Sequence, residues 1–185
     1  MKSLLKKYVL YHGTPKSCLK NIINKGFIIS TSDTHWMGKG VYFYDDVEKA
    51  YAFVSKTRKK VTPVVLKVEL EVKSEKILDL VNEEIDKQKF IKFIESQEPV
   101  YENSIRLKNV DMNTEKGRDK CIFLLKCALF DYYCFLNEIE LVICKHNTHT
   151  GSYRQMLMKS ISINKDIEIQ YCAKTLEIIK SINCV

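Results

Sequence analysis

The sequence predicts a single α+β domain. Its 185 residues lie within the roughly 100–200 residues of one ordinary domain. The composition, with 45% hydrophobic and 29% charged residues, is typical of a globular protein and excludes the disordered and fibrous classes. Segments with the two-residue period of strands and segments with the period of helices both occur, and no repeat, low-complexity tract or linker divides them. We therefore treat residues 1–185 as one domain.

The first half of the chain alternates between the two patterns. The run Tyr8–Tyr11 predicts a strand that leaves into a turn at 12–15. Ser17 is the expected cap of a helix that ends at Gly26, since apolar residues recur at helical spacing between them. The elements expected next are an extended segment at 27–31, a loop at 32–37, a strand at 41–44, a helix at 47–55 capped by Asp45 or Asp46, and a strand with one buried face at 63–72.

The second half contains the most apolar helix. The segment 118–136 predicts a helix in the centre of the domain, because most of its residues are apolar. The other elements expected are a short extended segment at 77–80, a helix at 83–96, an irregular stretch at 97–117, a strand at 138–144, a last strand at 166–172 and a closing helix at 173–182.

The apolar runs and the cysteines indicate the compartment. No run approaches the length of about 18 apolar residues that a membrane span needs, and Met1–Lys7 lacks the apolar region of a signal peptide. The seven cysteines form no CxxC pair, and most lie within apolar runs such as 121–127. This favours reduced core thiols over disulfides or a zinc site. We expect a cytoplasmic protein with no membrane partner and no bound metal.

The charge is modest. Thirty Lys and Arg residues against 23 Asp and Glu give a formal net charge of +7, and the one tight basic run is Lys56–Lys60. A solvated surface is one interpretation of this run. A weak attraction to nucleic acid or another polyanion is the other.

Three short motifs carry the chemistry, and they follow one another in a characteristic order. The first is Leu10–Thr14 and the second is Gly26–Ser30, followed by Met37–Phe43 and a helix that contains Lys49-Ala50. The third is Asn137–Ile143. Each motif alone is weak, since a histidine before a glycine, a tyrosine on a strand and a Glu-x-Glu on a strand are usually structural.

In combination, the motifs resemble the poly(ADP-ribose) polymerase and diphtheria-toxin-like branch of the ADP-ribosyltransferases, the H-Y-E group. The resemblance covers residues 1–55 and 137–144. It implies a split, mostly antiparallel sheet with NAD in its cleft, and NAD as co-substrate without a metal. The implied reaction releases nicotinamide and leaves a cationic ribosyl group. Such a site needs a flat slot for the pyridine ring, partners for the carboxamide and a nearby carboxylate.

The resemblance assigns the nicotinamide contacts. Gly13 has no side chain, so its backbone N–H and C=O are expected to bind the carboxamide. Tyr42 is expected to stack on one face of the ring. Phe53 matches the family position for the other face, and Tyr51 is the alternative if the helix is offset. The full set of expected NAD contacts is His12, Gly13, Thr14, Ser30, Tyr42 and Phe53.

The resemblance also assigns the ribose side. His12 is expected to hydrogen-bond the ribose hydroxyls, and Glu140 to accept from the 2′-hydroxyl and stabilise the cation. Glu138 lies two residues upstream, on the same strand face by the two-residue period, where other ADP-ribosyltransferases carry a glutamate that engages the acceptor. The residues expected to carry catalysis are His12, Tyr42, Glu140 and Glu138.

Four features depart from the H-Y-E pattern or add to it. The Glu-x-Glu of the third motif is one departure, and the run Ser30–Ser32, which resembles the arginine-serine-glutamate branch, is another. His12 stands where that branch has arginine, which keeps the H-Y-E interpretation. Ala50 replaces a serine that contacts the carboxamide in the polymerases, and Lys49 matches a lysine near their acceptor side.

Three functions follow as hypotheses. The first is an ADP-ribosyltransferase that modifies a macromolecule, either protein or nucleic acid. A toxin or defence effector with an antitoxin or inhibitor as partner would suit a small basic domain. The second is an NAD glycohydrolase, in which water is the acceptor. The third is a non-catalytic domain that binds NAD or ADP-ribose, against which the joint presence of His12, Tyr42 and Glu140 argues.

Overall fold

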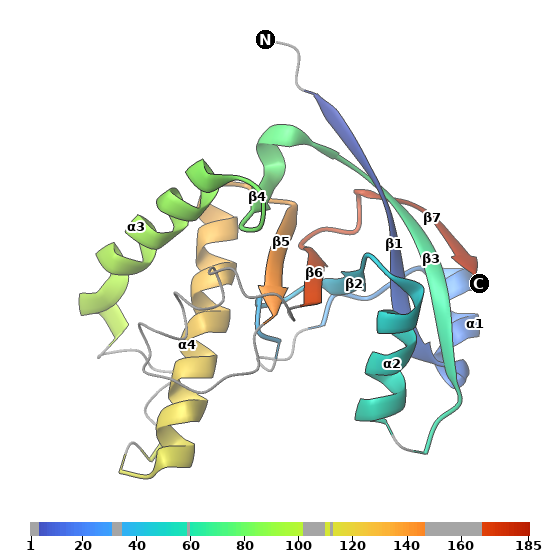
Figure 1. The fold of residues 1–185 in the computed structure, drawn as a ribbon, viewed down its shortest axis with the longest axis horizontal. Coiled ribbons are helices and arrows are strands. Elements are labelled where there is room, and N and C mark those ends of the chain that lie inside the picture. Colours follow the sequence, from blue (N-terminus) through green and yellow to red (C-terminus); the bar gives the residue numbers. More distant parts are fainter. Residues whose placement is uncertain (1–3, 31–34, 59, 102–109, 112, 147–167) are drawn as a thin grey trace.

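The structure is a computed structural model that describes residues 4–30, 35–58, 60–101, 110–111, 113–146 and 168–185. Within these residues the chain forms seven strands, four α-helices and one short 3-10 turn (Figure 1). In chain order they are β1 (Leu5–Pro15), α1 (Lys16–Lys25), β2 (Val41–Tyr44), α2 (Val47–Thr57), β3 (Pro63–Lys73), η1 (Ser74–Lys76), β4 (Ile77–Asp79), α3 (Glu84–Tyr101), α4 (Glu115–Leu136), β5 (Leu141–His146), β6 (Glu168–Ala173) and β7 (Ile179–Cys184).

The strands form one sheet in the order β4-β5-β6-β2-β1-β3-β7. Every neighbouring pair is antiparallel except β4 and β5, which are parallel. Helices α3 and α4 lie beside the β4–β5 end of the sheet, and α1 and α2 lie beside the β1–β3 end (Figure 1). The structure confirms the predicted α+β fold with a mostly antiparallel sheet.

The sheet is split in its middle. β1 and β3 pair residue by residue from Leu5 opposite Lys73 to Pro15 opposite Pro63. β1 and β2, in contrast, share the single pair Tyr11–Tyr44. The sheet therefore consists of two halves, β4-β5-β6-β2 and β1-β3-β7, which are joined at one point and separate beyond it.

Apolar clusters cover both faces of the sheet. One cluster contains Phe90, Phe130 and Val142 and packs α3 and α4 against β4 and β5. The second contains Leu66 and Leu141, and residues of α1 pack against it. The second cluster joins the two halves of the sheet, because it contains Leu66 of β3 and Leu141 of β5.

Strand β1 is longer than the sequence predicts. The turn expected at 12–15 is wrong, because the strand continues to Pro15 beside β3. Helix α1 then begins at Lys16 with Pro15 at its N-cap, so the expected cap at Ser17 is also wrong. The long alternating run of β3 supplies a hydrogen-bonding partner for the whole of β1, and this pairing overrides the local turn tendency of glycine and proline.

The closing helix expected at 173–182 is wrong. The segment Ile179–Cys184 forms strand β7 at the edge of the sheet, and the N–H of Val185 continues the pairing with a 3.1 Å bond to the Val65 carbonyl. Ile178 is buried beside it. β-branched isoleucines suit strands as well as helix faces, and the unpaired edge of β3 decides between them.

Other boundaries shift less. Asp46, and not Asp45, caps α2, since its carboxylate accepts from two N–H groups of the first turn. Helix α3 runs to Tyr101 into the stretch predicted to be irregular, part of which lies outside the described residues. The segment 27–30 forms no strand. None of the helices in the described part of the chain is both long and apolar enough to cross a membrane.

Candidate active site

His12 lies in the split, and one hydrogen bond fixes its ring. Its Nδ1 is 2.8 Å from the carbonyl oxygen of Tyr42, and because a carbonyl only accepts, Nδ1 carries the hydrogen and donates. The ring packs edge-on against Phe27 and Phe43, at centroid distances of 4.9 and 5.9 Å. Burial lowers the pKa of His12 below its ordinary value of 6.5, although the bond to Tyr42 opposes the shift. At neutral pH, His12 therefore presents Nε2 as an acceptor.

The backbone of Gly13 faces the same split. On β3, the carbonyl of Val65 accepts from Val185 on the far side, so Val65 directs its polar groups away from β1. In an antiparallel pair that does not exchange hydrogen bonds, both partners direct these groups outward, and the partner of Val65 is Gly13. The N–H and C=O of Gly13 therefore point toward β2, beyond the end of the β1–β2 ladder.

Helix α2 fills the space where a side chain on Gly13 would lie. A methyl group there would overlap the carbonyl oxygen of Ala50 and lie 2.8 Å from Cγ2 of Val54. Both of these residues are buried. Gly13 is therefore required for the close approach of α2, a role in addition to the ligand contact expected from the sequence. Since α2 also carries Phe53, Gly13 sets the distance between this aromatic residue and β1.

Tyr42 is held at its hydroxyl by the turn that precedes β2. The hydroxyl donates to the Gly38 carbonyl at 2.7 Å and accepts from the Met37 N–H at 3.0 Å. Burial raises the pKa of Tyr42 well above its ordinary value of 10, so the phenol stays protonated. The His35 ring lies against the Tyr42 ring, with centroids 5.2 Å apart and an interplanar angle of 33°. Tyr42 is thus an aromatic surface with a fixed orientation.

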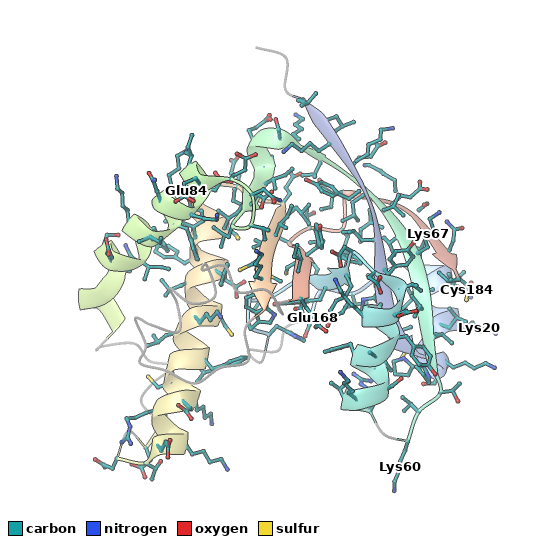
Figure 2. The ribbon with its side chains drawn as sticks, viewed as in Figure 1. Lys20, Lys60, Lys67, Glu84, Glu168 and Cys184 are labelled. Carbon is teal, nitrogen blue, oxygen red and sulfur yellow. The ribbon has the colours of Figure 1, made fainter. Side chains whose placement is uncertain are left out.

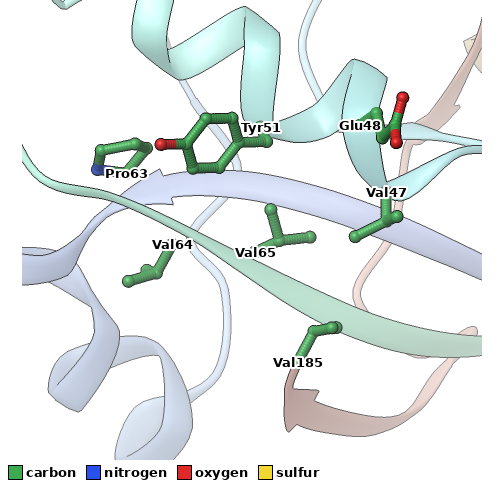
Figure 3. A pocket seen from close by; sticks show the side chains of 7 residues that line it. All are labelled: Val47, Glu48, Tyr51, Pro63, Val64, Val65 and Val185. Atoms are coloured by element: carbon green, nitrogen blue, oxygen red, sulfur yellow. The ribbon is translucent and has the colours of Figure 1, made fainter.

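The two aromatic candidates on α2 lie on different sides of that helix. Phe53 is about half exposed and its ring centroid lies 5.9 Å from that of Tyr44, on the β2 side. Tyr51 is turned toward β3, where it lines an apolar pocket with Pro63 and other residues (Figure 3). Of the two, Phe53 is the residue on the same side as Tyr42.

Glu140 comes directly before β5, and backbone hydrogen bonds to two neighbouring segments hold it. Its N–H donates to the Lys76 carbonyl and its carbonyl accepts from the Lys174 N–H, each at 2.8 Å. The next residue, Leu141, pairs with Ala173 of β6, which in turn pairs with Val41 of β2. Glu140 is therefore positioned by the strands that also position Tyr42.

The comparisons with known proteins identify the family. The model of the poly(ADP-ribose) polymerase catalytic domain matches residues 1–122. This chain belongs to that family. The poly(ADP-ribose) polymerase family uses NAD as its substrate. An uncharacterized protein of Methanocaldococcus jannaschii is 30% identical over 80 residues, which cover 40% of this chain and 37% of that protein. No solved structure matches the chain.

In this polymerase-family domain, Glu138 does not lie on a strand. Its φ of 50° is in the left-handed region. The N–H of Ile139 donates to the Cys134 carbonyl at 2.9 Å, and the N–H of Glu138 donates to the Phe135 carbonyl at 3.4 Å. This is the Schellman arrangement that ends α4. The predicted strand face shared by Glu138 and Glu140 is therefore wrong, because Glu138 belongs to the capping turn that follows α4 and β5 begins only at Leu141.

The Glu138 side chain is bound to a lysine. It is 79% exposed and its carboxylate pairs with the Lys76 ammonium. That hydrogen bond lowers the pKa of Glu138 below its ordinary value. The Glu140 carboxylate also raises the pKa of Lys76, as a smaller contribution. Lys76 thus contacts Glu138 through its side chain and Glu140 through its backbone carbonyl.

The remaining predicted site residues lie near the split in different environments. Thr14 is buried in β1. The Ser30 hydroxyl is 2.9 Å from Nε2 of His35, which connects it to the Tyr42 surface. Lys49, expected near the acceptor side, forms an ion pair with Asp45 at 2.8 Å.

The structure adds residues that the sequence reasoning missed. His35 lies in a segment predicted only as a loop, and Lys174 in one predicted as a helix, so neither had a pattern that indicated a site. Asp131 lies on α4, whose apolar composition suggested only a core helix. An acid in the most apolar part of such a helix was the available signal.

Within the described residues, Cys134 and Cys144 are buried and no cluster of metal ligands forms. Burial raises the pKa of the Cys134 and Cys144 thiols to about 12, so both are protonated and weakly nucleophilic at neutral pH. Across the residues that the structure describes, no three His, Cys, Asp or Glu side chains gather closely enough to hold a metal ion. His146 and His149 have the spacing of a His-x-x-His metal-ligand pair in the sequence, but His149 lies outside the described residues.

Proposed function

We propose that this chain is an NAD-dependent ADP-ribosyltransferase that releases nicotinamide and transfers ADP-ribose to a macromolecular acceptor. The observation that carries the proposal is the backbone of Gly13, whose N–H and C=O point into the split beside His12. A carboxamide has one carbonyl acceptor and an NH₂ donor. The two groups of Gly13 complement these, donor to acceptor and acceptor to donor.

The other residues bind the nicotinamide ring and the ribose around this carboxamide contact. Tyr42 stacks on one face of the nicotinamide, and Phe53 approaches the other from α2. His12 accepts a hydrogen bond from a ribose hydroxyl through Nε2, the nitrogen left free by its bond to Tyr42. A neutral histidine with a fixed tautomer suits this role, because it presents a lone pair and no positive charge near a developing cation.

Glu140 supplies the charge for bond cleavage. As the bond between the ribose C1′ and the pyridine nitrogen breaks, its electron pair leaves with nicotinamide and positive charge develops on the ribose. The Glu140 carboxylate stabilises this charge and accepts a hydrogen bond from the 2′-hydroxyl. A nucleophile then attacks C1′ and loses its proton. Electrostatic stabilisation of this kind is worth about 2–4 kcal/mol per group.

A second function has one observation in its favour. NAD hydrolysis, with water as the acceptor, needs no residue that binds a macromolecule. Glu138, the predicted acceptor residue, is paired with Lys76 at the end of α4. Because Lys76 holds Glu138, Glu138 is not free to act as the second carboxylate expected on the acceptor side, which favours water over a specific nucleophile.

The class of acceptor stays a prediction. The described residues of the basic run 56–60 are exposed, and Lys60 projects outward from the loop between α2 and β3, as do Lys20 and Lys67 from α1 and β3 (Figure 2). These cations favour a polyanion such as nucleic acid. The toxin or defence role, an antitoxin or inhibitor as partner and the cytoplasmic location stay predictions as well.

The test is the fate of labelled NAD in a cell lysate. Wild type, Glu140→Gln and a control, Glu69→Gln on the exposed face of β3, are incubated with NAD labelled in the adenylate part. Protein, RNA, DNA and free ADP-ribose are then separated. We expect label in one macromolecular fraction for wild type and control, and a roughly 10²–10³-fold lower rate for Glu140→Gln at unchanged NAD affinity. Label in free ADP-ribose alone would indicate the hydrolase, and undiminished turnover by Glu140→Gln would refute the catalytic assignment.

A further inference from the structure

The Lys174 side chain is buried at the end of β6 with all of its hydrogen-bonding capacity used. It is 9% exposed, and its ammonium donates to the carbonyls of Met37 and Lys39 and to Oδ1 of Asp131. An ammonium group has three N–H donors, so each has an acceptor. Two of the three acceptors belong to one turn, Met37–Lys39, which precedes β2.

Asp131 holds the same turn from α4. Its Oδ1 accepts from the Lys39 N–H at 2.8 Å and from Lys174 at 3.1 Å. The turn also packs tightly on the helix at Gly38, which has a φ of 79°, and a methyl group there would overlap the Asp131 carboxylate and lie 2.9 Å from the Cys127 carbonyl. The turn is therefore fixed between β6 and α4.

This turn provides both hydrogen bonds to the Tyr42 hydroxyl, the Gly38 carbonyl as acceptor and the Met37 N–H as donor. A displacement of the turn would thus remove the two contacts that orient the ring. The path from Lys174 and Asp131 to the phenol consists of direct hydrogen bonds and one short turn. Both charged residues lie beyond residue 122, where the match to the family ends.

We infer that Lys174 and Asp131 are positioning residues, which orient Tyr42 as the nicotinamide platform by fixing the Met37–Lys39 turn. The inference rests on the proposed function in one respect, since it takes Tyr42 to be the surface on which nicotinamide stacks. The alternative is that the pair affects the fold alone, since removing one partner of a buried ion pair leaves the other charge uncompensated and destabilises the protein.

Trp36 provides a readout that is independent of NAD. It is the one tryptophan of the chain and directly precedes the turn. Its side chain is buried, and Nε1 donates to Gln170 at 2.7 Å. If the turn is released, the indole becomes more exposed to water, so its fluorescence emission shifts to longer wavelength and acrylamide quenches it more strongly.

The experiment uses Lys174→Met, which keeps an unbranched side chain that is shorter by the terminal nitrogen and so removes the donors. The control is Lys180→Met, an exposed lysine of β7. We expect Lys174→Met to shift the Trp36 emission, to raise the dissociation constant of NAD about tenfold and to leave the rate at saturating NAD within about twofold, because the backbone contact to Glu140 is retained. The control should match wild type in all three.

A double-mutant cycle excludes a purely structural role. If Lys174 acts on NAD through Tyr42, Lys174→Met should weaken NAD binding no further once Tyr42→Ala is present. Independent, additive losses would overturn the inference, as would unchanged Trp36 emission in folded Lys174→Met. An absence of NAD binding by wild type would instead refute the proposed function, and the Trp36 comparison would still test the turn.

Two further variants keep the test decisive if Lys174→Met does not fold. Tyr42→Phe removes the hydroxyl from the other end of the path and should give a smaller Trp36 shift with weaker NAD binding. Asp131→Asn keeps an acceptor oxygen for Lys39 and Lys174 and should retain most of the wild-type NAD affinity. Wild-type emission and NAD affinity in Tyr42→Phe would overturn the inference.

Discussion

Gly13→Ala tests how the site is built, because the substitution adds one methyl group at the point where α2 meets β1. That methyl would overlap the Ala50 carbonyl oxygen and lie 2.8 Å from Val54 Cγ2, well inside the 3.4 Å at which ordinary contact begins. The Ala50 atom belongs to the helix backbone, so no side-chain rotation relieves the overlap. Helix α2 must move away from the sheet, and Phe53 moves with it.

The expected cost is that of overpacking a buried contact, about 1–3 kcal/mol of the free energy of unfolding. NAD affinity should fall about tenfold, because Phe53 and the backbone of residue 13 no longer keep their spacing. Urea unfolding measures the first effect and calorimetric titration with NAD the second. Gly26→Ala is the matched control, since its φ of 78° makes alanine unfavourable by about 1–2 kcal/mol while no atom lies within 4 Å of the added methyl.

The two measurements separate the two roles of Gly13. A loss of stability with wild-type NAD affinity would mean that the glycine serves helix packing alone, and that its backbone is not the carboxamide site. Wild-type stability of Gly13→Ala would refute the close packing of α2. Weakened NAD binding in Gly26→Ala would show that strain in any glycine disturbs the site, and would remove the argument for position 13.

Three further predictions concern the neighbouring residues. Because burial lowers the pKa of His12, the unfolded chain binds its proton before the folded one does. The free energy of unfolding should therefore fall as the pH drops from about 7 through 6.5, while NAD affinity, titrated at each pH, holds until the lowered pKa is reached. Phe53→Ala should weaken NAD binding roughly 2–12-fold, the equivalent of about 0.5–1.5 kcal/mol of stacking. Tyr51→Ala should bind NAD as wild type does. Weaker binding by Tyr51→Ala than by Phe53→Ala would place the nicotinamide slot on the β3 side of α2. Glu138→Gly should raise the midpoint of thermal unfolding by about 2–4 °C, since glycine suits the left-handed position, and should leave NAD hydrolysis unchanged. A loss of hydrolysis would mean that Glu138 takes part in bond cleavage.

Local patterns predicted the elements whose partners are close in sequence. The cap of α2, placed at Asp45 or Asp46, and the alternating run of β3 were found in this way, because a cap needs only the next turn and a half-buried strand shows its period directly. The prediction of a helix at 173–182 failed because the isoleucines fit the period of a helix as well as that of a strand. The choice between the two depends on the open edge of β3, more than a hundred residues earlier. For the same reason Lys174 was not identified as a site residue, since its partners are a turn and a helix that no local pattern connects.

The pair His12-Gly13 shows why two adjacent residues, in themselves weak signals, make a site. If the ladder between β1 and β2 continued past the pair Tyr11–Tyr44, Gly13 would stand opposite Tyr42 and donate its N–H to the Tyr42 carbonyl. In the structure the imidazole of His12 donates to that carbonyl instead.

Buried backbone groups in a sheet are normally paired, so the side chain of one residue leaves the N–H of the next for a ligand. The histidine thereby has two uses, and both need the same tautomer. Nδ1–H takes the partner that would close the split, and Nε2 remains as the acceptor for a ribose hydroxyl. A glycine must follow, because α2 occupies the space where any side chain would lie. The motif is thus a geometric unit, in which the histidine opens the sheet and the glycine lets helix and ligand approach the opening from different directions.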